Sequence, residues 1–283
     1  MFPTPIERTV PATRIAFRAA LFASLALWLL PMVGVALTSI RSIDDLNRGN
    51  LWGWPSEFRL IENYSAVFAE QRMAQFIVNS VLITVPAVLG AVTLACMAGF
   101  ALAKYRFRGN LALFVIFIAG NLVPLQILMV PVRNLTIATG LYDTRWALIL
   151  FHAAFQTGFC TLFMRNFIKQ LPDDMLDAAR NDGLSEFQIF RHIVVPLVRP
   201  AIAAIAALTF TFVWNDYFWS LVLVQSDDVR PLTAGLQSLR GMWLTSWQLI
   251  SAGSIVAAVP PVLIFFFMQQ HFIAGLTAGA QND

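Results

Sequence analysis

The sequence predicts an all-α, polytopic membrane protein, and two observations carry this prediction. The first is composition: 58% of the 283 residues are hydrophobic, and the mean hydropathy is +0.68, well above the value of an ordinary soluble domain. The second is length, because several apolar segments reach the roughly 20 residues that a helix needs to cross a bilayer core about 30 Å thick. Since lipid offers no partners to backbone polar groups, these segments are expected to be helices.

Six spans are expected after a short cytoplasmic tail, residues 1–14. Their ranges are 15–40, 75–103, 110–132, 144–166, 198–224 and 247–271, with boundaries good to about 2–4 residues. Arg14 and Arg18 precede the first span as in a signal peptide, but no A-x-A cleavage pattern follows, so this span is expected to remain. Residues 15–283 then form a single transmembrane domain.

The distribution of Lys and Arg predicts the orientation of the spans. A cytoplasmic N-terminus leaves eleven basic residues inside and eight outside. Three of the eleven crowd into the short connection Lys104–Arg108, and short loops carry most of the positive-inside bias. We therefore expect both termini in the cytoplasm and the loop 41–74 outside, where it serves as a lid, a docking surface or a plain connector.

A polar segment, residues 171–197, lies between the fourth and fifth spans on the inner side. It holds five of the sixteen acidic residues of the chain. Gly183 can take the left-handed conformation that ends a helix. Ser185 and Gln188 form a capping-box pattern for a second helix, which is expected to end before Pro196. The pattern predicts a helix–turn–helix, here called the elbow, and its acidic first helix favours a protein partner over anionic lipid.

Small residues recur every four positions in the second span: Ala87, Ala91, Ala95, Gly99 and Ala103. Such a face lets another helix backbone approach closely, so we expect it at a helix–helix interface, the alternative being a merely alanine-rich span. The two cysteines, Cys96 and Cys160, both fall inside apolar spans. They are expected to be small core residues rather than a disulfide or a metal site.

Polar side chains inside the spans are candidates for a solute path, because such groups usually face protein or water rather than lipid. The candidates are Asn121, Gln126, Trp214, Asn215 and Asp216. For Trp214, Asn215 and Asp216, helix packing is an equally good explanation. Asp216 is expected near the outer interface or, alternatively, facing a cavity. Pro260 and Pro261 are expected to interrupt the sixth span.

Motifs for catalysis or nucleotide binding are absent from the sequence. It contains no G-x-x-x-x-G-K-[ST], H-E-x-x-H or G-x-S-x-G pattern and no Cys/His cluster with ligand spacing. We therefore expect no catalytic residues, no metal site and no cofactor in this chain. Basic flanks of spans explain the net charge of +3 without nucleic acid. Ion-coupled carriers hold paired ionisable residues at mid-membrane, whereas the spans here offer His152 and at best Asp216.

The elbow carries a family pattern. Asp177-Ala178-Ala179, Gly183 and Ile193-Val194-Val195-Pro196-Leu197 resemble the EAA loop of binding-protein-dependent ABC importer permeases, and the run to Pro200 is similar to the carbohydrate, maltose-permease-like branch. Further matches in order are Glu62–Tyr64, Gly99–Phe107, Val123–Gln126, Val130–Pro131 and Trp214–Phe218. Two positions depart from the pattern: Asp177 replaces a glutamate, and Leu184 replaces an alanine.

The resemblance implies the six-helix fold of type I ABC importer permeases, most like the smaller of two permease subunits in maltose-type systems. In that family the loop seats in a cleft of a cytosolic ATPase subunit. The implied coupling residues are Asp177, Ala178, Ala179 and Gly183, to which Asp182 and Pro196 of the same loop are added. Implied partners are a second permease subunit, a dimer of ATP-binding subunits that holds ATP and Mg, an extracytoplasmic solute-binding protein, lipid of the inner membrane, and a sugar.

Two other classes of function remain open at this point. One is a membrane scaffold or receptor subunit that transports nothing, and the other is an ion-coupled secondary carrier that acts alone. A nucleotide-binding subunit in the purified complex excludes the first, whereas transport by this chain without ATP establishes the second. The substrate stays open among sugars, sugar alcohols, glycosides and glycerol phosphates.

Overall fold

The computed structural model describes residues 11–69, 72–239 and 246–280, and the regular elements there are all helices, with one isolated bridge between Arg41 and Phe58. Within these ranges, four helices are long and apolar enough to cross a membrane: Pro11–Ser39, Met73–Lys104, Arg145–Lys169 and Trp247–Met268. Two sharply bent helix pairs raise the number to six if each pair is one span. The all-helical membrane fold is confirmed.

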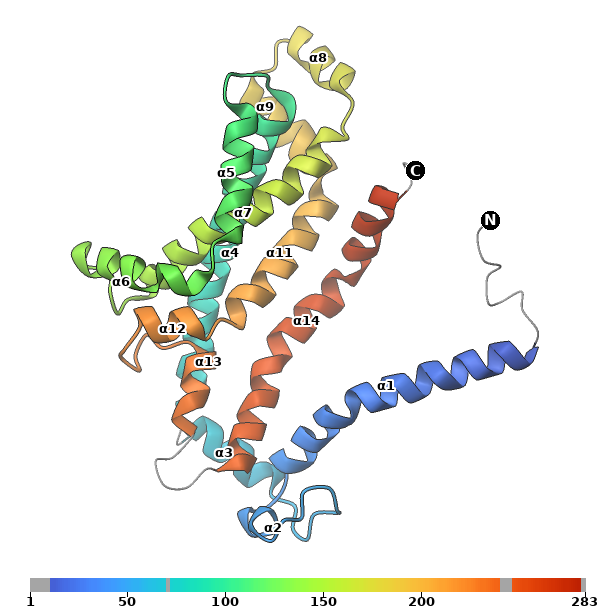
Figure 1. Cartoon of the computed structure of the whole chain (residues 1–283), viewed down its shortest axis with the longest axis vertical. Helices are drawn as coiled ribbons and strands as arrows, with labels where there is room; N and C mark the ends of the chain where they lie inside the picture. The colour runs from blue at the N-terminus through green and yellow to red at the C-terminus, as the bar shows by residue number, and fades with distance from the viewer. Residues whose placement is uncertain (1–10, 70–71, 240–245, 281–283) are drawn as a thin grey trace. The chain divides into compact units, whose positions relative to one another are not determined.

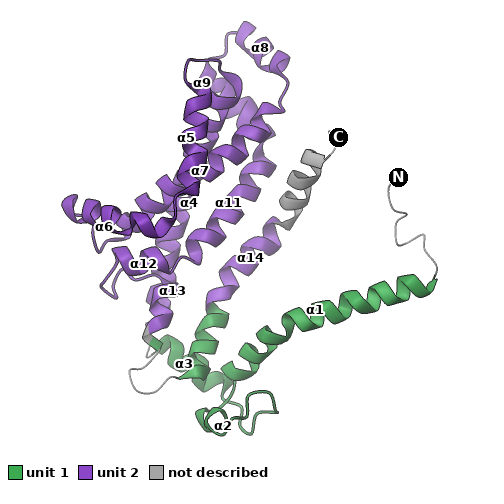
Figure 2. Ribbon diagram, viewed as in Figure 1, with its two compact units in different colours: residues 1–71, 239–256 green, residues 72–238, 257–283 purple. Residues whose placement is uncertain are grey.

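Contacts divide the chain into two compact units (Figure 2). Unit 1 comprises residues 1–71 and 239–256, and unit 2 comprises residues 72–238 and 257–283. The expected single transmembrane domain, residues 15–283, stays a prediction.

Unit 1 contains α1 (Pro11–Ser39), α2 (Ile43–Asn47), α3 (Leu60–Ala69) and the start of α14 (Trp247–Ala280). The connection between α1 and α3 is held by hydrogen bonds around a buried arginine. Arg41 donates to the carbonyls of Asn50, at 2.6 Å, and Gly53, and Asp45 accepts from the Ser56 amide at 2.8 Å. The predicted external loop therefore folds back on itself, because its buried polar groups need partners.

Unit 2 is built around α4 (Met73–Lys104), which packs on α7 (Arg145–Lys169) and α11 (Arg199–Trp214) (Figure 1). The small-residue face of α4 is buried and meets α7: a Cβ on Gly99 would lie 3.0 Å from the Arg165 amide nitrogen and 3.1 Å from the Met164 Cβ. No side chain fits there without moving backbone. The predicted close helix–helix interface is confirmed.

Two predicted spans are broken helices. Residues 110–132 form α5 (Asn110–Leu122), η2 (Leu125–Leu128) and α6 (Met129–Ala138), with a bend of 93°. The break falls at Val123 and Pro124, since proline lacks an N–H and disfavours helical backbone in the residue before it. Residues 198–224 likewise divide into α11 and α12 (Phe218–Leu223), followed by α13 (Leu232–Gly235) and η4 (Leu236–Leu239).

The last span is more continuous than predicted, whereas the two spans above are broken. α14 continues through Pro260 and Pro261 without interruption. Transmembrane helices tolerate proline where neighbouring groups satisfy the freed backbone carbonyls.

Candidate functional site

The elbow comprises α8 (Asp173–Asn181), α9 (Glu186–Ile189), the π-turn η3 (Phe190–Val194) and α10 (Val195–Leu197). Figure 1 shows it at the same end of α4 and α7 as the α4–α5 connection. The second half of the elbow, residues Glu186–Leu197, forms a bent pair with α11 at 77°, so α9 points away from the axis of α11.

The turn between α8 and α9 has the geometry that the sequence predicts. Gly183 has φ +85°, and the Leu184 amide donates to the Ala179 carbonyl at 3.1 Å while the Gly183 amide donates to the Arg180 carbonyl at 3.0 Å. These two bonds define a Schellman motif. The capping box of Ser185 with Gln188 is also formed. Both local predictions are confirmed.

The second helix does not end before Pro196, which corrects the sequence prediction. The backbone passes through Pro196 by way of the π-turn, in which the Val195 amide donates to the Phe190 carbonyl. The wider turn shifts the hydrogen-bond register ahead of the proline, whose ring would clash with a regular i−4 carbonyl.

One face of α8 is buried and the other is exposed. Leu176 and Ala179 are 1% and 7% exposed and lie in an apolar cluster with residues of α4 and α7. Of the predicted coupling residues, Asp177, Ala178, Asp182 and Gly183 are exposed, whereas Ala179 contacts the protein's own core and Pro196 is half-buried. Leu184 is half-buried against the same cluster.

Arg180 bridges two exposed carboxylates of the elbow, Asp177 and Glu186. Its guanidinium donates to Asp177 Oδ1 at 2.6 Å and to Glu186 Oε1 at 2.8 Å. The Glu186 and Asp177 carboxylates raise the pKa of Arg180 above its usual value. A basic group of a partner would therefore compete with Arg180 for Asp177.

Asp216 occupies the break between α11 and α12. Its carboxylate accepts from the amides of Trp219, at 3.3 Å, and Ser220, at 3.1 Å, which caps α12. The same carboxylate lies 3.4 Å from His152 Nε2 of α7, and its side chain is 13% exposed. Asp216 thus faces protein in this unit, in line with the helix-packing alternative, although sequence reasoning did not identify the α12 cap or His152 as its partners.

The other solute-path candidates are not gathered into one group. Trp214 is 2% exposed and its Nε1 donates to the Ala257 carbonyl at 3.0 Å. Asn215 and Asn121 are exposed and bond within their own helices, to the carbonyls of Thr211 and Phe117, and Gln126 is exposed in η2. A path through these side chains stays a prediction.

Asp216→Ala is expected to lower the melting temperature of the detergent-purified protein, because the α12 cap is worth about 1–2 kcal/mol. Asp216→Asn keeps a capping oxygen and should lose less. Thermal unfolding followed by tryptophan fluorescence measures both, with Asp174→Ala, an exposed carboxylate on α8, as the control. An unchanged melting temperature for Asp216→Ala would contradict the capping role.

Lys104 is a second residue whose role sequence reasoning missed. Its side chain is only 4% exposed, and its Nζ lies 2.5 Å from the Leu171 carbonyl and 2.7 Å from Asp173 Oδ1. A lysine at the end of an apolar helix indicates an interface position. Its partner lies 69 positions along the chain, and no local pattern reveals that contact.

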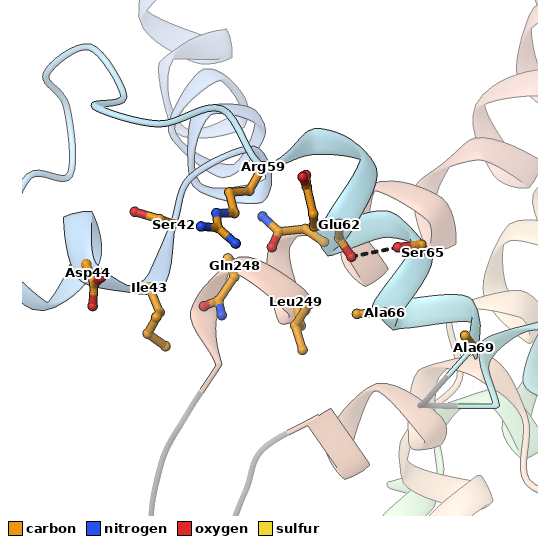
Figure 3. A pocket seen from close by; sticks show the side chains of 11 residues that line it. Ser42, Ile43, Asp44, Arg59, Glu62, Ser65, Ala66, Ala69, Gln248 and Leu249 are labelled. Atoms are coloured by element: carbon orange, nitrogen blue, oxygen red, sulfur yellow. Dashed lines mark hydrogen bonds between the residues drawn. The ribbon is translucent and has the colours of Figure 1, made fainter.

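Unit 1 contains a polar pocket of about 650 Å³ (Figure 3). The lining comes from the segment around α2, from α3 and from the start of α14: Ser42, Ile43, Asp44, Arg59, Glu62, Asn63, Ser65, Ala66, Ala69, Gln248 and Leu249. The Gln248 Oε1 atom is buried without a hydrogen-bond partner in the described part of the chain. The loop 41–74 thus has a recessed polar surface.

The described ranges contain no group of three or more His, Cys, Asp or Glu side chains that could hold a metal ion. Cys96 and Cys160 are free and buried in the unit 2 core. Their predicted role as small core residues is confirmed.

The all-helical bundle, its broken spans and its elbow define a multi-pass membrane protein of the permease class. The chain belongs to the family of binding-protein-dependent transport system inner membrane components, whose model matches residues 91–277. It is therefore a non-catalytic inner-membrane permease component of a binding-protein-dependent ABC transporter.

Curated relatives align along most of the chain. An osmoprotective compounds uptake permease protein of Synechocystis sp. is 34% identical, and the alignment covers 90% of this chain and 87% of the relative. An arabinooligosaccharides transport system permease protein of Halalkalibacterium halodurans is 35% identical, with 88% of this chain and 89% of the relative aligned. A lactose transport system permease protein of Rhizobium radiobacter is 30% identical, with 77% of this chain and 79% of the relative aligned.

A solved structure of the same fold is a chain from a bacterial ABC transporter that imports the acidic polysaccharide alginate. It superimposes with a TM-score of 0.82 at 23% identity and covers 95% of this chain and all of that chain. A chain of the MetNI methionine ABC transporter superimposes with a TM-score of 0.57 at 17% identity over 72% of this chain and 95% of that chain.

Proposed function

We propose that this chain imports a sugar or sugar-like solute as one of two permease subunits, and that its elbow couples transport to ATP hydrolysis on a partner. The observation that carries the proposal is the two-sided character of α8. Its inner face, with Leu176 and Ala179, packs into the bundle, while Asp177, Ala178 and Asp182 remain exposed at the end of the unit.

The packing of α8 gives the elbow a mechanical connection to the spans. The apolar cluster that holds Leu176 and Ala179 also contains Cys96 and Phe100 of α4 and Ile168 of α7. Protein interiors are close-packed and transmit displacement rather than absorb it. A partner that moves α8 during its nucleotide cycle would thus move the inner ends of α4 and α7.

The substrate class rests on the relatives. Permeases for arabinooligosaccharides, α-glucosides and lactose are 30–35% identical to this chain over 77–88% of it. Osmoprotective compounds are the substrates named for another relative. Together these names support a small polyhydroxylated solute.

The arrangement in the membrane follows from the basic residues. Lys104, Arg106 and Arg108 lie at the end of α4 that carries the elbow. The positive-inside rule puts this end in the cytoplasm, with both termini inside and the loop 41–74 outside, where the solute-binding protein delivers its cargo.

Purification of the native complex tests this function. We expect an ATP-binding subunit and a second permease to co-purify with this chain, and reconstituted vesicles to accumulate the solute only with ATP and the loaded binding protein. A complex that contains no nucleotide-binding subunit would support a scaffold or receptor subunit. Uptake by this chain alone without ATP would establish a secondary carrier.

A further inference from the structure

A polar network joins the elbow to the inner end of α4. Arg180 of α8 contacts Glu186 of α9 across the turn, with its Nε 2.8 Å from Oε1 and its NH2 nitrogen 3.4 Å from Oε2. The hydroxyl of Tyr105, the residue after α4, donates to Glu186 Oε2. The Arg180 guanidinium lies 6.0 Å from the centre of the Tyr105 ring. Three segments therefore meet at one carboxylate.

Lys104 adds a second connection. Its nearly buried ammonium reaches Asp173, the first residue of α8, at 2.7 Å, and the Leu171 carbonyl ahead of it at 2.5 Å. Lysine is almost never fully buried unless it is paired. The hydrogen bond from the Lys104 side chain also lowers the pKa of Asp173, so this carboxyl is ionised at neutral pH.

The turn itself offers little side-chain resistance to bending. Gly183 has no side chain, and a Cβ placed on it would find no atom within 4 Å. Besides the apolar packing of Leu176, Ala179 and Leu184, the angle between α8 and α9 depends on the two backbone bonds of the Schellman motif and on the Arg180–Glu186 contact. Without that contact, a force on α8 could be absorbed at the turn.

We infer that Arg180, Glu186, Tyr105 and Lys104 are positioning residues that lock the elbow to α4, so that movement of α8 reaches the spans. This inference rests on the proposed coupling function. Burial, helped by the hydrogen bond to Glu186, raises the pKa of Tyr105 to about 12. Its hydroxyl therefore keeps the proton that it donates throughout the physiological range.

Charge reversal tests the lock in the complete transporter, reconstituted with its partner subunits and binding protein. The variants are Arg180→Glu, Glu186→Arg and the double reversal, and the readout is solute accumulated per ATP hydrolysed. Each single reversal should lower this ratio about 2- to 30-fold, the range over which mutations along a coupling network act. The double variant restores the opposite-charge pair across the turn, but neither the contact with Asp177 nor the Tyr105 hydrogen bond, so it should recover part of the loss. Tyr105→Phe, which removes one hydrogen bond, should have a smaller effect.

Arg191→Glu is the matched control, because Arg191 is exposed on η3, outside the network, and the variant makes the same charge change on the same elbow. It should keep the wild-type ratio. The inference is overturned if the single variants keep that ratio, if uptake and hydrolysis fall together with the amount of assembled complex, if the double variant does not recover, or if Arg191→Glu falls equally. Absence of an ATP-binding subunit from the wild-type complex would instead overturn the proposed function, and this inference with it.

Discussion

Gly183→Val is expected to abolish solute uptake while the protein remains in the membrane in normal amounts. The backbone at Gly183 has φ +85°, a region that costs an L-residue roughly 1–2 kcal/mol, and a β-branched residue more. The chain can relieve this strain by opening the Schellman turn, which changes the direction of α8. ATP-dependent uptake into vesicles and the membrane level of the protein are the two measurements.

Gly140→Val is the matched control for this prediction. Gly140 also has positive φ, +69°, and open space around its Cβ position, but it follows α6 rather than lying in the elbow. The same strain there should leave uptake largely intact. Wild-type uptake by Gly183→Val, or equal loss in both variants, would contradict a specific coupling role for the turn.

Gly99→Leu is expected to produce the largest loss of folded protein. The Cβ alone would lie 3.0 Å from the Arg165 amide nitrogen and 3.2 Å from the Met164 carbonyl carbon, so the clash is with backbone and no rotamer relieves it. Overpacking a close-packed interface costs about 1–3 kcal/mol or more, and here it would separate α4 from α7. Size-exclusion chromatography of detergent extracts and thermal unfolding should both show the loss.

Gly120→Leu gives the comparison for that variant. Gly120 lies in α5, and a Cβ placed on it would meet no atom within 4 Å. The same substitution should therefore leave the yield and the melting temperature nearly unchanged. A stable, monodisperse Gly99→Leu protein would show that α4 and α7 do not approach as closely as described.

Local signals in the sequence predict local structure well in this chain. The helix end at Gly183 and the capping box of Ser185 with Gln188 depend on residues within five positions of each other, and both are formed. The small-residue face of α4 was also predictable, because helical periodicity alone places Ala95 and Gly99 on one side.

Contacts between distant segments explain what the sequence did not predict. Pro196 suggests a helix end, but packing of Val194 in the core accompanies a π-turn that carries the helix onward. The pairing of Asp216 with His152 joins residues 64 positions apart, and the Lys104–Asp173 contact joins residues 69 apart. Hydropathy predicted the apolar spans that begin near Asn110 and Arg199. It did not predict the breaks near Pro124 and Asn215, because the residues on both sides of each break are apolar.

The half-buried position of Leu184 has a consequence for the coupling proposed above. Its side chain lies against the protein's own apolar cluster, which also holds residues of α4 and α7. Position 184 therefore contributes to how firmly the turn is seated on the spans. A smaller side chain here would leave a void beneath the elbow, and the turn would be looser on its own protein before any partner is bound.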